Sequence, residues 1–144
     1  MQGRGDDAGR RRVRAGLLAL ALIAAILGGW QFLAPRAFYD AFPLRDTPWV
    51  SLLPPFNDHL LRDVGEGNLA FAVLFLWAAR TLERGLVRAS LAAWLVAATL
   101  HLAYHGLHLA PFAPGTAAAQ MLALGAVIAL PAALLAATAK TEFG

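Results

Sequence analysis

The hydrophobic pattern divides the chain into four long apolar segments, which are separated by short polar stretches and by one longer one. Windows of roughly 20 mostly apolar residues are typical of α-helices that cross a bilayer. Such windows lie at residues 15–33, at 68–82 with a polar lead-in from Asp58, at 86–109 and at 116–139. The pattern therefore predicts an all-α fold, an integral membrane four-helix bundle, in which residues 15–144 form one transmembrane domain.

Prolines and glycines set the expected boundaries of these helices. Two consecutive prolines stop any helix before Asn57, so that Asn57 or Asp58 is expected to cap a helix that begins near Asp58. Gly85 is expected to end the hairpin between the second and third segments. Pro131 is expected to kink the fourth helix without breaking it. Residues 35–56 then form a long outer loop, whose aromatic side chains suit the lipid headgroup layer or a lid over the bundle.

Two sets of polar residues share one spacing. One set lies at the start of the second segment and the other at the end of the third, and these two ends are expected on the same side of the membrane. The spacing i, i+4, i+7 places the three members of each set on one face of a helix. The sets are His59, Asp63 and Glu66 in the second segment, and His101, His105 and His108 in the third. Charged groups at membrane depth face the bundle interior and pair there. We therefore expect the two sets to face each other in a polar pocket at or near the outer surface.

These side chains are predicted to form a transition-metal site, because imidazole and carboxylate are common ligands of zinc, copper and iron. The chain contains no cysteine, which excludes disulfides and thiolate ligands. The side chains expected to support the ligands are Arg62, Tyr104, Gln31 and Gln120. The pattern does not choose among copper, zinc and iron. A site of this kind suits a metal-dependent oxidoreductase or hydrolase that acts on an apolar substrate.

Three other interpretations stay open at this point. In the first, the pocket is free of metal and binds a lipid or another small ligand, or relays protons, with Asp63 and Glu66 held by Arg62 and the histidines. In the second, two histidines are the axial ligands of a haem. In the third, the polar residues are structural, because Asp58, Arg62 and Glu66 have the spacing of ordinary salt bridges within a helix.

Charge sets the expected topology. The net charge is +3, and 11 of the 12 lysines and arginines are arginine. Basic residues precede the first segment, flank the turn between the second and third, and follow the fourth at Lys140. Under the positive-inside rule both termini are then cytoplasmic, which we call N-in/C-in, and the site faces the extracytoplasmic side. Residues 1–14 lack apolar content and are predicted to be a disordered basic cytoplasmic arm.

The same features bear on the partners of the chain and on whether its first helix is retained. The N-terminal arginines have no aromatic residues among them, which argues against nucleic acid as a partner. The first segment is longer than the apolar core of a signal peptide and has no convincing cleavage site, so a retained helix is expected. Small residues such as Ala92, Ala93, Ala97 and Gly125 favour self-association into a homo-oligomer within the membrane.

Three runs of sequence carry a resemblance to a known family. They are FYDAFP at 38–43, WVSLLPPFNDHLLRDVGEGNLA at 49–70 and HLAYHGLH at 101–108. These runs resemble a family of small actinobacterial membrane proteins with four predicted spans, which are similar in layout to DoxX-like proteins. The resemblance covers residues 36–109. It implies a four-helix layout in a bacterial cell membrane and a shared set of polar residues, and it implies no particular reaction.

Overall fold

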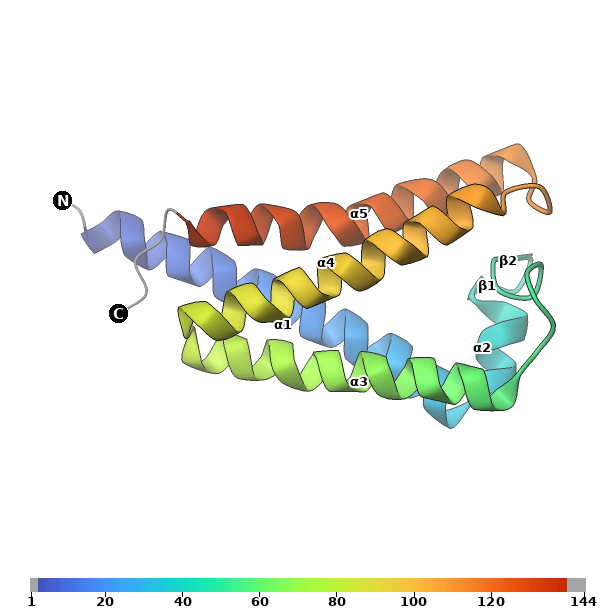
Figure 1. Cartoon of the computed structure of the whole chain (residues 1–144), viewed down its shortest axis with the longest axis horizontal. Coiled ribbons are helices and arrows are strands. Elements are labelled where there is room, and N and C mark those ends of the chain that lie inside the picture. The colour runs from blue at the N-terminus through green and yellow to red at the C-terminus, as the bar shows by residue number, and fades with distance from the viewer. Residues whose placement is uncertain (1–2, 140–144) are drawn as a thin grey trace.

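Helices make up most of residues 3–139, the part of the chain that this computed structural model describes (Figure 1). The elements in chain order are α1 (Gly3–Leu33), α2 (Pro35–Ala41), β1 (Pro43–Leu44), β2 (Thr47–Pro48), α3 (Asp58–Thr81), α4 (Arg84–Leu107) and α5 (Pro114–Thr138). Three helices, which are α1 over Asp7–Leu33, α4 and α5, are long and apolar enough to cross a membrane. The predicted helical architecture is confirmed, and these three helices have the length and composition expected of membrane spans.

The four long helices are arranged as two pairs (Figure 1). α1 packs mainly against α3, and α4 packs mainly against α5. The pairs lie close together where the turn at Leu82 and Glu83 joins α3 to α4, and we call this the closed end. They separate toward the opposite end, where α2, the β-hairpin and the loop between α4 and α5 lie, and we call this the open end. Much of the half of α4 nearest the open end therefore lies away from α3 (Figure 1).

Glycines allow α1 and α3 to approach closely. A Cβ atom added to Gly28 would lie 2.7 Å from the carbonyl oxygen of Gly65, and one added to Gly65 would lie 2.8 Å from the amide nitrogen of Phe32. Small residues of this kind let membrane helices bring their backbones together. Beside this contact, Asn68 Nδ2 donates a hydrogen bond of 2.7 Å to Gln31 Oε1. The α1–α3 pair is thus held by close backbone packing and by a polar link between the helices.

Two arginines tie the ends of the same pair. Carbonyl groups in the last turn of a helix lack partners within that helix. At the closed end Arg14 Nε donates to the Ala79 oxygen of α3 at 3.0 Å, and at the open end Arg62 donates to the Phe32 oxygen of α1. Each arginine lies in the first half of one helix and binds a carbonyl in the last turn of the other, so both ends of the pair are held in register.

An aromatic cluster joins α3 to α4 in the closed half. Trp94 lies edge-on to Phe71 and Phe75, with ring centroids 5.2 and 5.4 Å apart. Its indole Nε1 also donates to the Val127 oxygen of α5 at 3.3 Å. Pro131 has no N–H to bond that oxygen within the helix. The expectation that Pro131 does not break the helix is confirmed, because α5 is continuous through it. The Trp94 indole donates to the Val127 oxygen, which the proline cannot bond.

The turn between α3 and α4 differs from the prediction. α3 ends at Thr81, Leu82 adopts the left-handed conformation at φ 51°, and Gly85 already lies in the first turn of α4. Glu83 caps α4 by accepting hydrogen bonds from the amides of Gly85 and Leu86 at 2.8 and 2.7 Å. Leu82 is 2% exposed, so burial of its side chain in the core offsets the cost of a conformation that glycine usually takes. At the other end of α3 the predicted cap is confirmed, because Asn57 accepts from the Leu60 amide at 3.0 Å.

Two further predictions need correction. The disorder predicted for residues 1–14 is wrong over residues 3–14, which are part of α1, because Val13 is fully buried and helix packing continues to this point. Met1 and Gln2 lie outside the described residues. The predicted loop at 35–56 contains α2 and the hairpin in which Pro43 pairs with Pro48. Pro35 begins α2 at a position where a missing N–H has no cost.

Candidate functional site

The bundle-facing side of α4 changes from apolar to polar toward the open end. Leu91 and Trp94 are buried on this side, and the helical spacing continues through Ala98 to His101 and His105. In the closed half the side meets the rings of α3. In the open half α3 has separated from α4, so that His101 is exposed, whereas His105 is buried against α5. The two imidazole rings contact each other, with centroids 4.5 Å apart.

His105 and Gln120 are the most unusual polar residues of the structure. Gln120 is fully buried and His105 is 7% exposed. The two side chains are neighbours across the α4–α5 contact, and their atoms do not meet the distance and angle limits of an ordinary hydrogen bond. Within residues 3–139, the Nδ1 atom of His105 and both amide atoms of Gln120 have no hydrogen-bond partner. Leaving a buried polar group unpaired costs about 1–3 kcal/mol, so these atoms call for a partner, such as water, an ion or a polar ligand.

Tyr104 and His108 stand beside this pair without joining it. Their rings stack at 4.2 Å, and His108 Nδ1 lies 2.7 Å from the Tyr104 carbonyl oxygen. Because a carbonyl can only accept, Nδ1 of His108 carries the proton in this hydrogen bond. The ring of Tyr104 also lies edge-on to His105, with centroids 5.8 Å apart. His108 therefore ends α4 locally, and Tyr104 is the ring that connects it to the buried histidine.

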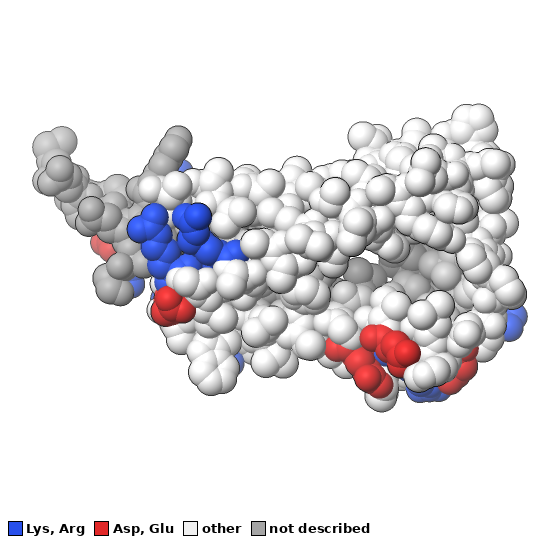
Figure 2. Space-filling view, in the orientation of Figure 1, with Lys and Arg blue, Asp and Glu red and all other residues white. Residues whose placement is uncertain are grey.

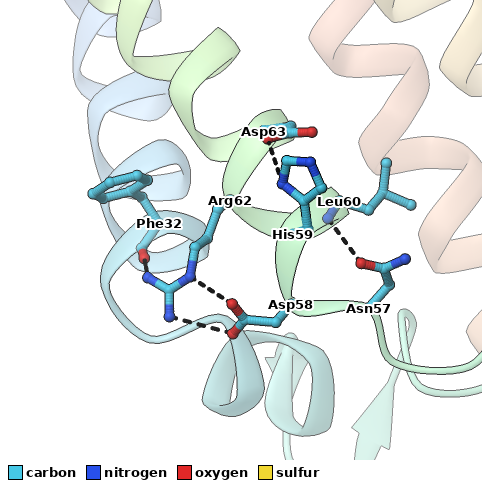
Figure 3. Close-up of polar contacts among 7 residues, drawn as sticks. All are labelled: Phe32, Asn57, Asp58, His59, Leu60, Arg62 and Asp63. Atoms are coloured by element: carbon cyan, nitrogen blue, oxygen red, sulfur yellow. Dashed lines mark hydrogen bonds and ion pairs between the residues drawn. The ribbon is translucent and has the colours of Figure 1, made fainter.

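The polar set at the start of α3 lies on a different side of that helix from the one that meets α4. The α4-facing side carries Phe71 and, at helical spacing, Val64 and Leu60. Asp63 and Glu66 fall outside this side and are exposed, and His59 is exposed with them. His59 Nδ1 pairs with Asp63 Oδ1 at 3.1 Å, as Figure 3 shows. The side chains of this pair are 88% and 51% exposed, respectively.

Arg62 supports α1 and the first turn of α3, and it has no role at the histidines. It binds the Asp58 carboxylate through Nε at 2.8 Å and through a second nitrogen at 3.2 Å, and it also binds the Phe32 oxygen (Figure 3). The salt bridge expected from the i, i+4 spacing is confirmed for Arg62 and Asp58.

The predicted metal site is not formed by the residues proposed for it. Among the described residues, no group of three or more His, Asp or Glu side chains is placed to hold a metal ion. The predicted ligands are divided among several places. His59, Asp63 and Glu66 lie on an exposed face of α3, His105 is buried in the α4–α5 contact with exposed His101 one turn before it, and His108 lies at the end of α4. The physical reason is the separation of the two helix pairs, together with the side of α3 on which the acidic residues lie.

The predicted supporting residues are divided in the same way. Gln120 and Tyr104 lie at His105, whereas Gln31 bonds Asn68 between α1 and α3. A haem held by two axial histidines does not fit His101 and His105, because these residues are one turn apart on the same helix and cannot reach opposite faces of one ring.

The surface between the pairs is hollowed at the open end. Figure 2 shows a hollow between the α3 side of the molecule and the α4–α5 side, with acidic side chains gathered at its margin. Two apolar residues on the α4-facing side of α3, Leu60 and Val64, are 59% and 46% exposed. The sequence contains a signal for this feature, since the large rings of Phe71, Phe75 and Trp94 are followed toward the open end by smaller or polar residues.

No family model, curated protein or solved structure matches the chain.

Proposed function

We propose that the chain is a multi-pass membrane protein that binds one amphipathic small molecule, such as a lipid or a quinone-like compound, between its two helix pairs. The polar head of the ligand is bound by His101, His105 and Gln120, and its apolar chain occupies the hollow at the open end. The observation that carries the proposal is the set of buried polar atoms on His105 and Gln120 that have no hydrogen-bond partner among the described residues.

The chemistry of these side chains defines the polar head. An amide offers two donors and an acceptor, and a neutral imidazole offers one donor and one acceptor. A head with carbonyl or hydroxyl oxygens satisfies such groups without requiring a charge in the membrane. Exposed Leu60 and Val64 on the opposite side of the hollow suit an alkyl or isoprenoid chain. The ligand enters at the open end, where the pairs separate (Figure 1).

The proposal includes four spans with the N-in/C-in topology. α3 has 24 residues, as does α4, and it packs along α1 with Val73 and Trp77 each 62% exposed on its outer side. Large apolar side chains that are this exposed suit contact with lipid. Arginines at the closed end place that end in the cytoplasm under the positive-inside rule. The ligand site then lies in the extracytoplasmic half of the membrane.

The test is native mass spectrometry of the full chain, purified in mild detergent without a histidine tag. We expect one small-molecule adduct on the wild-type protein and its loss in the His105→Phe, Gln120→Leu double variant. His59→Phe is the matched control, because His59 is exposed on α3, and it is expected to keep the adduct. A wild-type protein that carries no adduct and takes up none from a bacterial lipid extract would overturn the proposal.

A second candidate is a transition metal bound at His101 and His105. The contact between the two imidazoles favours it, because histidines at i and i+4 can bind one ion from a single helix. Elemental analysis of the same preparation tests it. About one equivalent of copper, zinc or iron that is lost in His101→Ala would favour the metal, whereas less than about a tenth of an equivalent would remove it.

A further inference from the structure

The two ends of the molecule use the same helical spacing with opposite combinations of charge. Among the described side chains, every ion pair joins residues i and i+4 at the open end: Arg36 with Asp40, Arg62 with Asp58, and His59 with Asp63. At the closed end this spacing joins like charges on α4, Arg84 with Arg88, whereas on α1 it joins Arg10 with Arg14 and also Asp7 with Arg11, whose side chains form no ion pair among the described residues. Like charges at this spacing destabilise a helix, so the closed end lacks the compensation that the open end has.

Carboxylates within the described part of the closed end do not supply this compensation. Glu83 uses both carboxylate oxygens to cap α4. Asp7 accepts a hydrogen bond from Arg11 through its backbone oxygen, and the ion pairs of the described residues do not include its side chain. Of the arginines there, Arg14 is engaged by the Ala79 carbonyl. Arg80, Arg84 and Arg88 are exposed and make no ion pair to any described residue.

These arginines lie where membrane helices leave the apolar layer. Arg84 begins α4, Arg88 follows one turn later, and Arg80 lies in the last turn of α3. Figure 2 shows basic side chains gathered together at this end. Long arginine side chains at such positions reach toward the headgroup layer. The guanidinium group forms forked hydrogen bonds with phosphate oxygens.

We propose that the closed end is a binding surface for the phosphodiester headgroups of anionic phospholipids, with Arg84 and Arg88 as its centre. The lipid supplies the negative charge that carboxylates supply at the open end. The surface is separate from the ligand site at His105, because the two lie at opposite ends of α4.

The test compares lipid retention by two double variants of the full chain. Wild-type protein, Arg84→Gln with Arg88→Gln, and Arg36→Gln with Arg45→Gln are incorporated into nanodiscs of mixed phosphatidylglycerol and phosphatidylcholine. Native mass spectrometry then counts the lipids that each protein retains after release from the disc. We expect the wild type and the open-end variant to retain phosphatidylglycerol preferentially. The closed-end variant should lose this preference by about fivefold for each arginine removed.

Two further measurements keep the outcome unambiguous. Thermal unfolding in zwitterionic detergent is expected to show the closed-end variant at least as stable as the open-end variant, because the closed-end variant loses a like-charge repulsion and the open-end variant loses an ion pair. This result excludes misfolding as the cause of the loss. Raising the salt to about 1 M should weaken the preference of the wild type, because the screening length falls to about 3 Å. Equal retention of the two lipids by the wild type, or equal loss in both variants, overturns the proposal. Tighter binding of the closed end to an oligonucleotide than to phosphatidylglycerol also overturns it.

Discussion

Gln120 and Gln31 are two buried glutamines in different situations, and the difference predicts opposite effects of one substitution. Gln120 is fully buried without a hydrogen-bond partner among the described residues, whereas Gln31 is 8% exposed and bonds Asn68. Removing a polar group that has no partner relieves a desolvation cost, and removing a paired group leaves its partner unsatisfied. Replacing each glutamine by leucine therefore tests whether the polar groups at His105 and Gln120 need a hydrogen-bond partner from outside the protein.

We expect Gln120→Leu to raise the unfolding free energy of the delipidated protein by about 1–3 kcal/mol. Gln31→Leu should lower it by a similar amount, because Asn68 loses its acceptor in a buried contact. The measurement is chemical unfolding in detergent, followed by circular dichroism. A destabilised Gln120→Leu variant would show that the amide is satisfied inside the protein, and the ligand proposal would lose its main support.

At the scale of elements, the α1–α3 contact depends on two glycines that have matched neighbours. Cβ atoms at Gly28 and Gly65 would meet backbone atoms at 2.7 and 2.8 Å, whereas Cβ atoms at Gly29 and Gly67 would meet nothing within 4 Å. Alanine at Gly28 or Gly65 is expected to force the helices apart and to destabilise the protein by about 1–3 kcal/mol.

Gly29→Ala and Gly67→Ala are the controls for this contact. Both are expected to be neutral or to stabilise by up to about 1 kcal/mol, because alanine favours a helix over glycine. Thermal unfolding in one detergent measures all four variants. Equal effects at the close and the open glycines would contradict a backbone contact at this crossing.

Trp94 and Pro131 provide a second test at this scale. The Trp94 indole bonds the Val127 carbonyl, which the main chain of α5 cannot bond because residue 131 is proline. Trp94→Phe is expected to cost about 1–3 kcal/mol, since a carbonyl in an apolar environment is left unpaired. In a Pro131→Ala background the backbone N–H returns to that carbonyl, and the cost should fall. A double-mutant cycle that shows no coupling between the two positions would contradict this role of Trp94.

Features set by local sequence could be predicted, and features set by the placement of distant segments could not. The cap at Asn57, the Asp58–Arg62 pair and the approximate ranges of the long helices follow from spacing and helix termini. For the polar sets of α3 and α4 to meet, these two helices would have to stay together along their whole length. Their separation depends on the close packing of α3 against α1 and of α4 against α5, which no window of sequence contains.

At the scale of the whole molecule, the separation of the two helix pairs divides the protein into parts with different chemistry. The closed half is packed by rings and buried aliphatic residues, and at its end Arg80, Arg84 and Arg88 form no ion pair within the described part of the chain. The open half has balanced ion pairs, a cluster of aromatic rings around α2 and the buried polar pair at His105. In that cluster Phe38 stacks on Phe42 at 4.7 Å, and Trp49 lies edge-on to Phe42 at 5.8 Å. Such rings suit the headgroup layer.

The two ends lie on opposite sides of the membrane only if α3 crosses it. If all four long helices span, the hairpin at Thr47 and the turn at Arg84 are separated by the membrane. If α3 lies on the surface and only α1, α4 and α5 span, the two positions share one side. The chain contains no cysteine, so single cysteines at these positions report their side without interference. In intact cells that express the chain, a membrane-impermeant maleimide is expected to label Thr47→Cys directly. Arg84→Cys should be labelled only after permeabilisation, and labelling of both before it would reduce the spans to three.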